Sequence, residues 1–253
     1  MAQQPAPLVS VIMPAYNAEK YIAAAIESVC AQSMPNLELI ILDDCSSDGT
    51  AAIAERFAAK DPRIRLYAGA QNVGVAQLRN QGIELSRGRY IALLDSDDTW
   101  HPQKLEKQLE LLKKNDAALC YCSYAIVDDA GQKLRNDYIV PERIDYPGQL
   151  KENVIGCSTV LADALLLKKH NFRTDFYHED YVLWLELLRN GYKMTGSPAV
   201  LVNWRYQQNS RSFNKWKSMK NRWQIYRQME KLPVTTSLWN LLCYAAAGLK
   251  KYR

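Results

Sequence analysis

Two carboxylates one residue apart, Asp95 and Asp97, come directly after the apolar segment 90–94. Uncompensated charge at the end of a buried strand is costly, so a bound cation is a natural partner for both. Carboxylate oxygens suit Mg²⁺ or Mn²⁺, and either ion can bridge nucleotide phosphates. The alternative is that Asp97 or Asp98 caps a helix that begins near Pro102. Acidic and polar residues at other predicted strand ends favour a metal site with Asp97 and Asp95 as ligands.

A second acidic pair, Asp43 and Asp44, follows the apolar segment 37–42. A carboxylate in this position can accept the N3–H of a uracil or thymine ring, and the ring of Tyr16 can stack on such a base. The alternative is an Asx-type turn within residues 44–47. These residues alone do not decide between base binding and turn formation.

A third acidic group, His178-Glu179-Asp180, immediately precedes a helical pattern at 181–190. Acids at a helix N-terminus commonly cap the helix and complement its dipole. The alternative is that Asp180 is a general base, which deprotonates a hydroxyl nucleophile. Residues 14–20 contain no glycine, so neither a dinucleotide-binding fingerprint nor a P-loop follows the first strand. This argues against a dehydrogenase and against an ATPase.

These acidic groups have to be positioned by the surrounding helices and strands, and the sequence alternates strand and helix patterns. The predicted strands are 8–13, 37–42, 64–67 and 90–94, and the predicted helices between them are 21–32, 51–60 and 75–85. This alternation predicts an α/β fold with a mostly parallel central sheet flanked by helices. Ligands of such sheets bind beyond the carboxyl ends of the strands, so the polar groups are expected to form one shared site.

The 253 residues are 48% hydrophobic and 23% charged, which suits one large globular domain. The charge is uneven. Residues 203–253 contain eleven Lys and Arg and one acid, so with +5 for the whole chain residues 1–202 carry a net −5. The acidic bulk argues against a nucleic-acid partner, whereas the basic end suggests an anionic one.

The basic end has a helical pattern that Pro233 interrupts, with a second apolar helix predicted at 238–249. One stripe of the first helix is aromatic and apolar: Trp216, Met219, Trp223 and Tyr226. Two interpretations stay open for this helical, basic extension. It packs on the main domain, or it makes a peripheral contact with an anionic membrane surface.

The six cysteines contain no CxxC pair, which makes a zinc site improbable and favours ordinary core packing for Cys120 and Cys122. The first residues carry neither a basic residue nor an apolar run, and no stretch reaches the roughly 18 apolar residues that span a bilayer. Free thiols fit a reducing compartment. We therefore expect a cytoplasmic protein, either free or peripheral on the cytoplasmic face of the membrane.

Taken together, four motifs in this order resemble family 2 glycosyltransferases over about residues 8–212. They are VSVIMPAYN at 9–17, DDCSSD at 43–48, LDSDD at 94–98 and HED at 178–180. The stretch from 209 through Trp216 and Lys217 is also similar to bacterial glycosyltransferases of teichuronic-acid and related surface-polysaccharide synthesis. The resemblance implies a glycosyltransferase-A-type, Rossmann-like fold, a nucleotide-sugar donor and a divalent cation, Mn²⁺ or Mg²⁺.

The resemblance also implies roles for individual residues. Pro14, Tyr16 and Asp44 would form the base pocket, and Arg79, from the Arg-Asn pair at 79–80, would contact the donor. Asp95 and Ser96 would bind the nucleotide-sugar, with Asp95 near the ribose and the metal. Asp97 would be the main metal ligand, and Asp180 the catalytic base. Many relatives carry a late histidine where this chain has Gln207, so the resemblance does not carry a His ligand to the metal or diphosphate over to this chain. Arg205 or Arg211 could neutralise phosphate charge instead.

The predicted function is an inverting transfer of a sugar, most simply from a UDP-sugar, to a hydroxyl of a saccharide or lipid-linked saccharide acceptor in surface-polysaccharide synthesis. Competing interpretations are a metal-dependent nucleotidyltransferase and a non-catalytic binding protein. The predicted division is a catalytic domain at 1–212 and the extension at 213–253. Within the domain, residues 8–100 would bind the nucleotide-sugar and residues 101–212 the acceptor.

Overall fold

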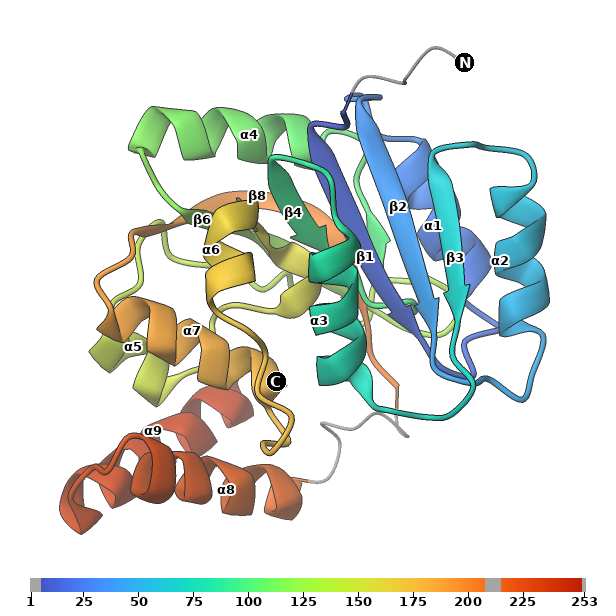
Figure 1. Ribbon diagram of the computed structural model, residues 1–253. Coiled ribbons are helices and arrows are strands. Elements are labelled where there is room, and N and C mark those ends of the chain that lie inside the picture. Colours follow the sequence, from blue (N-terminus) through green and yellow to red (C-terminus); the bar gives the residue numbers. More distant parts are fainter. Residues whose placement is uncertain (1–5, 208–214, 252–253) are drawn as a thin grey trace.

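The computed structural model describes residues 6–207 and 215–251, which build an α/β domain around one eight-stranded sheet (Figure 1). In spatial order the strands are β3 (Ile64–Ala68), β2 (Leu37–Asp43), β1 (Val9–Ala15), β4 (Tyr90–Leu93), β7 (Leu161–Asp163), β6 (Leu119–Val127), β8 (Met194–Arg205) and β5 (Thr99–Trp100). The first four are mutually parallel, as are β6 and β8. The short strands β7 and β5 are antiparallel to their neighbours. The predicted α/β fold with a mostly parallel sheet is confirmed.

Side-chain alternation along the strands divides the core into two layers. Val9, Val11 and Met13 of β1 contribute to one hydrophobic cluster, whereas Ile12 contributes to the other. On the first face the sheet packs against α1 (Ile22–Cys30), α2 (Thr50–Ala58) and α4 (Lys104–Asn115). On the second face it packs against α3 (Val75–Leu85), α6 (Ala164–Lys169) and α7 (Glu179–Arg189). Helices therefore cover both faces of the sheet, as expected.

Helix α3 lies unusually close to the sheet because Gly82 has no side chain. A Cβ added at Gly82 would lie 2.5 Å from Cγ2 of Ile12 on β1, well inside contact distance. The close approach matters for function, since α3 carries Arg79 one turn before Gly82. Its buried face holds this arginine next to the carboxyl end of the sheet.

The second half of the chain is less regular and contains elements that the sequence patterns did not predict. These are β5, β7, α5 (Tyr146–Lys151), α6 and the short 3₁₀ segment η1 (Cys157–Thr159). The long strand β8 has a register irregularity against β6 near Ser123. Cys120 and Cys122 are buried in the core, as predicted.

The basic extension forms two helices, α8 (Lys215–Gln224) and α9 (Val234–Lys251), with a π-helical turn, η3 (Ile225–Met229), after α8. It packs beneath α5 and α7, where Figure 1 shows it in red. A third hydrophobic cluster joins Ile225 and Tyr226 of the extension to Tyr181, Val182 and Leu185 of α7.

Polar contacts reinforce this packing. The carboxylate of Glu230 accepts hydrogen bonds from Tyr146 of α5 (2.5 Å) and Arg189 of α7 (3.1 Å). The first of the two interpretations of the extension, packing on the main domain, is therefore observed. Among the described helices, none has the length and the apolar character needed to span a bilayer.

Candidate active site

A cleft of about 610 Å³ opens at the carboxyl ends of the parallel strands. The loops after β1 and β4, the start of α7, η1 and the end of β8 contribute to its walls. The predicted site residues that line it are Pro14, Tyr16, Arg79, Asp95, Ser96, Asp97 and Asp180. Predicted site residues as far apart in the sequence as Pro14 and Asp180 therefore meet in one cavity. Asp44 lies outside this lining.

Asp97 has the electrostatic character of a cation ligand. Its partial burial, reinforced by the neighbouring Asp95 carboxylate, raises the pKa of Asp97 to about 6. The side-chain amide of Gln207 donates a hydrogen bond of 3.0 Å to Oδ2 of Asp97. Two carboxylates that repel each other in a partly dry cleft gain from a bound cation.

The next acid, Asp98, has a structural role. It is buried, and its two oxygens accept hydrogen bonds from Oγ of Ser158 (2.5 Å) and from the backbone N–H of Arg205 (2.9 Å). Helix α4 begins at Lys104 with Gln103 as its N-cap, and no side chain caps it. Neither Asp97 nor Asp98 is a helix cap, so that alternative for the acidic motif is wrong. Asp98 instead joins the acidic loop to β8 and η1.

Arg205 holds the same loop from the β8 side. Its guanidinium donates to the backbone carbonyl oxygens of Asp97 (2.9 Å), Asp128 (2.5 Å) and Asp129 (2.9 Å) and lies over the ring of Tyr21. Nε and Nη1 of Arg205 therefore donate to the protein's own backbone and are not available to bind a substrate phosphate. A second arginine considered for that purpose, Arg211, lies outside the described residues.

Arg79 links Asp95, one of the two predicted metal ligands, to α7. Its side chain is 5% exposed, and it donates to Oδ1 of Asp95 (2.6 Å) and to Oε1 of Glu179 (2.7 Å). Both ion pairs use terminal guanidinium nitrogens, and the guanidinium also lies over the ring of Phe172. A planar, forked donor suits this double pairing. Arg79 therefore fixes the distance between the end of β4 and the start of α7.

Asp180 lies in the first turn of α7, next to buried Glu179. Its Oδ1 accepts a hydrogen bond of 2.7 Å from the backbone N–H of Tyr181. A carboxylate at this end of a helix also interacts favourably with the helix dipole, so Asp180 stabilises the N-terminus of α7. Unlike buried Glu179, Asp180 is partly exposed and faces the cleft, where a hydroxyl substrate can reach it.

The predicted base pocket is only partly in the cleft. Tyr16 is 55% exposed and follows β1, so its ring is available for stacking. Asp44 is 3% exposed, and its oxygens accept the backbone N–H groups of Val73 (2.7 Å) and Gly74 (2.9 Å). Gly74 has a φ of 85°, a conformation that favours glycine, and it precedes α3. Asp44 thus shapes the turn that introduces the helix carrying Arg79.

The Asx-type turn considered for this region is made by the preceding acid. Asp43 accepts from the backbone N–H (3.0 Å) and the hydroxyl (2.5 Å) of Ser46. The same loop contacts the one after β1, because the backbone N–H of Asn17 donates to Oγ of Ser46 and Oδ1 of Asn17 accepts from Ser47 N–H. The loops after β1 and β2 are therefore tied together beside Tyr16.

Several cleft residues were not predicted from the sequence. Ser158 accepts the backbone N–H of Asp95 (3.1 Å) and donates to Asp98, so it fixes both ends of the acidic loop. Arg222 of α8 and Tyr244 of α9 also line the cleft. Ser158 stands in a turn-rich stretch without periodicity, which gave no signal. The stripe of Trp and Tyr in the extension gave a signal for packing, but none for this contribution to the cleft.

The acids of the cleft fit a divalent cation whose remaining ligands come from the substrate. In the described part of the chain no three His, Cys, Asp or Glu side chains are grouped as metal ligands. Asp95 and Asp97 remain as two oxygen donors facing the cleft. Mg²⁺ and ions like it are commonly held by one or two carboxylates together with water and substrate phosphates. A pair of acids is therefore sufficient if a diphosphate supplies further ligands.

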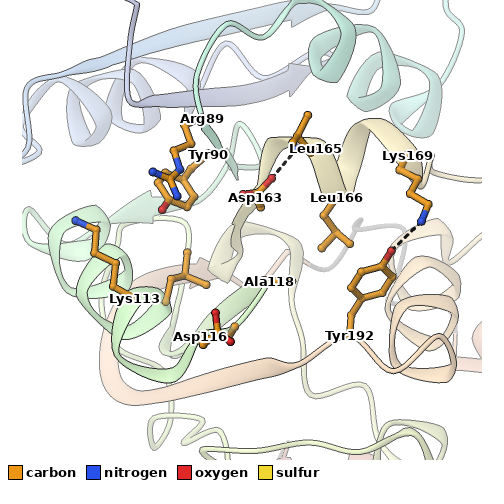
Figure 2. A pocket seen from close by; sticks show the side chains of 12 residues that line it. Arg89, Tyr90, Lys113, Asp116, Ala118, Asp163, Leu165, Leu166, Lys169 and Tyr192 are labelled. Atoms are coloured by element: carbon orange, nitrogen blue, oxygen red, sulfur yellow. Dashed lines mark hydrogen bonds between the residues drawn. The ribbon is translucent and has the colours of Figure 1, made fainter.

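A second pocket, of about 480 Å³, lies at the opposite ends of the strands from the cleft, near the amino ends of β4 and β6 (Figure 2). Its acid Asp163 caps α6 by accepting the N–H of Leu165 (2.8 Å), and Lys169 donates to the hydroxyl of Tyr192 (3.2 Å). These polar groups satisfy one another. They hold α6 and the end of α7 in place.

Comparison with known proteins points to one family. Residues 10–167 match the family model described as glycosyl transferase family 2. The chain is 40% identical over 248 residues to a Bacillus subtilis protein named for teichuronic acid biosynthesis, the glycosyltransferase TuaG, with 97% of both chains covered. It is 38% identical over 247 residues to Escherichia coli WfgD, named as a UDP-Glc:alpha-D-GlcNAc-diphosphoundecaprenol beta-1,3-glucosyltransferase, covering 97% of this chain and 95% of WfgD.

Solved structures share the fold at low sequence identity. S. aureus TarS 1-349 in complex with UDP-GlcNAc superposes with a TM-score of 0.70 at 18% identity, over 92% of this chain and 70% of that one. Mannosyltransferase PcManGT from Pyrobaculum calidifontis, in complex with GDP-Man and Mn²⁺, also gives a TM-score of 0.70 at 18% identity, over 97% and 77% of the two chains. The glycosyltransferase-A-type fold expected from the motifs is confirmed.

Proposed function

The chain belongs to glycosyl transferase family 2, and from this premise we propose that it transfers a sugar from a UDP-sugar to a hydroxyl of a lipid-linked saccharide during surface-polysaccharide synthesis. The observation that carries the proposal is the shared cleft. Asp95, Ser96 and Asp97 enter it from the end of β4, and Asp180 enters it from the start of α7. Acids for binding a cation and an acid for accepting a proton thus line one cavity.

For the donor, we propose that Pro14 and Tyr16 hold the base, with Asp44 accepting its N3–H. A carboxylate has about four lone-pair sites, and the two backbone donors to Asp44 leave some of that capacity unused. The names of two proteins similar to this chain support uracil: WfgD is named for UDP-Glc, and TarS was solved with UDP-GlcNAc. Ser96, between the two acids, would contact the donor beside the ribose.

For the cofactor, we propose that Asp97 and Asp95 hold Mn²⁺ or Mg²⁺. When bound, the cation would neutralise charge that develops on the departing diphosphate. Arg79 sets the position of Asp95 and, through Glu179, of the start of α7. PcManGT, which has the same fold, was solved with Mn²⁺ and GDP-Man. We assign Arg79 a positioning role, because two carboxylates already occupy its terminal nitrogens.

For the chemistry, we propose a single in-line displacement with inversion. Asp180 accepts the proton of the acceptor hydroxyl as that oxygen attacks the anomeric carbon from the face opposite the diphosphate. The C–O bond to the diphosphate breaks as the new C–O bond forms, and UDP leaves. Positioned general bases contribute about 10²–10⁴ in rate. In this proposal residues 8–100 mainly bind the donor, and residues 101–212 mainly bind the acceptor.

For the cellular site, we propose that the extension contacts the cytoplasmic face of the membrane. One solvent-exposed face of α9 is mostly apolar. Four of its side chains are 49–66% exposed: Val234, Leu238, Leu242 and Leu249. Trp239 (60%) borders that face, and Trp216 of α8 is 82% exposed. A lipid-linked acceptor would be presented at such a surface.

A screen of nucleotide sugars with Mn²⁺ and with Mg²⁺ tests the proposed reaction. We expect UDP to be released from one UDP-sugar, slowly by hydrolysis and faster when a lipid-linked acceptor is added, and we expect EDTA to stop both. Release of pyrophosphate in place of UDP would identify a nucleotidyltransferase. Absence of turnover with every nucleotide sugar would favour the non-catalytic binding protein.

A further inference from the structure

Arg222 of α8 is a buried cation with unused hydrogen-bond donors. It is 2% exposed and lies in the wall of the cleft. Its guanidinium is stacked between two aromatic rings, 3.7 Å from the ring centroid of Tyr181 and 3.9 Å from that of Tyr244. Its Nε and Nη1 atoms are buried and have no hydrogen-bond partner. Buried donors are nearly always paired, so this exception requires an explanation.

The other arginines of the cleft differ from Arg222. Arg79 is paired with two carboxylates, and Arg205 donates to three backbone carbonyls. The described lining contains six acids: Asp95, Asp97, Asp98, Glu152, Glu179 and Asp180. An excess of carboxylates repels an anionic substrate wherever no cation compensates for it. Among the described arginines of the lining, Arg222 is the one whose guanidinium has no anionic or carbonyl partner.

We propose that Arg222 forms an anion subsite of the cleft and binds the phosphate group that links the acceptor saccharide to its lipid. The proposal rests on the proposed function, because it names a further part of the acceptor. The guanidinium is a permanent cation, and the N–H groups on its unpaired Nε and Nη1 atoms can each donate to a phosphate oxygen. The two tyrosine rings hold the guanidinium plane in place before the ligand arrives, which reduces the entropy lost on binding.

Its surroundings assign the subsite to the acceptor and not to the donor. Arg222 stacks on Tyr181, the residue directly after the proposed base Asp180. A phosphate held at Arg222 therefore lies on the side of the cleft where the acceptor hydroxyl is deprotonated. The donor diphosphate instead has the cation site at Asp95 and Asp97, at the end of β4. Arg222 also belongs to the extension whose outer face carries the exposed apolar side chains, which places the subsite between the base and the proposed membrane surface.

Calorimetry on the full chain separates the two sources of phosphate. The first titrant is inorganic pyrophosphate in EDTA, at fixed ionic strength, so that no divalent cation assists its binding. The second titrant is UDP with Mn²⁺, which reports the donor site. The proteins are the wild type, Arg222→Gln, Arg222→Lys and the matched control Lys220→Gln, which removes an exposed charge from the same helix.

We expect Arg222→Gln to weaken pyrophosphate binding at least tenfold and to leave UDP binding within twofold of wild type. Arg222→Lys should recover part of the pyrophosphate affinity, and Lys220→Gln should match wild type. Unchanged pyrophosphate affinity in Arg222→Gln overturns the subsite. An equal loss of UDP affinity, in Arg222→Gln and in the more conservative Arg222→Lys, assigns the arginine to the donor and overturns the acceptor proposal. Failure of wild type to bind UDP would count against the proposed function, whatever pyrophosphate does.

Discussion

The side-chain amide of Gln207 donates a hydrogen bond of 3.0 Å to Oδ2 of Asp97. It therefore reaches the carboxylate that we assign as the main metal ligand, from the position where the resemblance to family 2 glycosyltransferases would place a histidine. An amide nitrogen is not a metal ligand, whereas a neutral imidazole nitrogen is. The glutamine orients Asp97, and a histidine in the same place would add a ligand.

We expect Gln207→His to tighten Mn²⁺ binding about tenfold in the presence of UDP, since it would add a third protein ligand to the site. Gln207→Ala is the matched control and should weaken binding slightly, because Asp97 loses its hydrogen bond. Calorimetric titration of Mn²⁺ into the UDP complex measures both effects. If the histidine variant binds Mn²⁺ no better than the alanine variant, Gln207 does not lie beside the cation.

Protons should compete with the cation for Asp97. Burial and the Asp95 carboxylate raise the pKa of Asp97 to about 6, so the carboxyl is protonated below that pH and ionised above it. We expect the apparent Kd for Mn²⁺ to be level above about pH 7 and to rise by up to about tenfold for each pH unit below 6. In Asp97→Asn, binding should be weak and should lose this dependence near pH 6. A wild-type profile without a break near pH 6 would contradict the assignment.

The base assignment is tested at Asp180. Asp180→Asn retains the size of the side chain and an acceptor oxygen for the N–H of Tyr181, but it cannot take up a proton at neutral pH. We expect transfer to fall by about 10²–10⁴ while UDP binding with Mn²⁺ stays within about twofold. Asp175→Asn is the control, because this exposed acid lies five residues earlier and pairs with Arg173. Near-normal turnover of the Asp180 variant would rule out this residue as the base.

The sequence predicted the first half of the fold well because its signals are local. Strands β1, β2 and β4 are short and mostly apolar, and predicted site residues follow these runs closely. The antiparallel strands β7 and β5 are only three and two residues long, too short to show a period of two. They are strands because their backbone groups pair with neighbouring strands, and the local sequence does not show such pairing.

The same reasoning separates the site residues that were predicted from those that were missed. Asp95, Asp97 and Asp180 are acids at element ends, where type and position both suggest chemistry. Ser158 and Arg222 act through contacts with residues more than 40 positions away, such as Asp98 and Tyr181. Serine and arginine are common on protein surfaces, so residue type alone did not indicate a role for Ser158 or Arg222, and the structure was needed to place them in the cleft.

A buried lysine away from the cleft should make stability depend on alkaline pH. Lys104 is fully buried, donates to Oε1 of Gln108 (2.7 Å) and lies 3.9 Å from the ring centroid of Trp100. Burial lowers the pKa of Lys104 from 10.5 to about 8 in the folded chain. Between these two values the unfolded chain binds more protons than the folded chain, so stability rises with pH.

We therefore expect this lysine to add about 2 kcal/mol to the free energy of unfolding between pH 7 and pH 9.5. Lys104→Met fills the same space without a charge and should lack the gain. Urea unfolding of both proteins at the two pH values measures it as a difference between them, which cancels the titration of other groups. If the difference in free energy of unfolding between the two proteins does not change with pH, burial does not lower the pKa of Lys104.

The last prediction concerns the membrane contact, for which the two sides of α9 have different roles. Tyr244 and Ala247 face the cleft, whereas Leu238 and Leu242 are 49% and 66% exposed to solvent. A solvent-exposed apolar stripe beside a basic segment gains free energy by burial at an anionic lipid surface, at about 25 cal/mol per Å² of apolar area. We expect the double variant Leu238→Ser with Leu242→Ser to lose most co-sedimentation with vesicles that contain anionic lipid.

Leu134→Ser removes a side chain with similar exposure (45%) away from the extension, so this control variant should sediment like wild type. Because the substituted positions face away from the cleft, release of UDP from a UDP-sugar in detergent should be the same in all three proteins. Equal sedimentation of the double variant and wild type would mean that the stripe does not bind membrane, and that the extension serves the cleft alone.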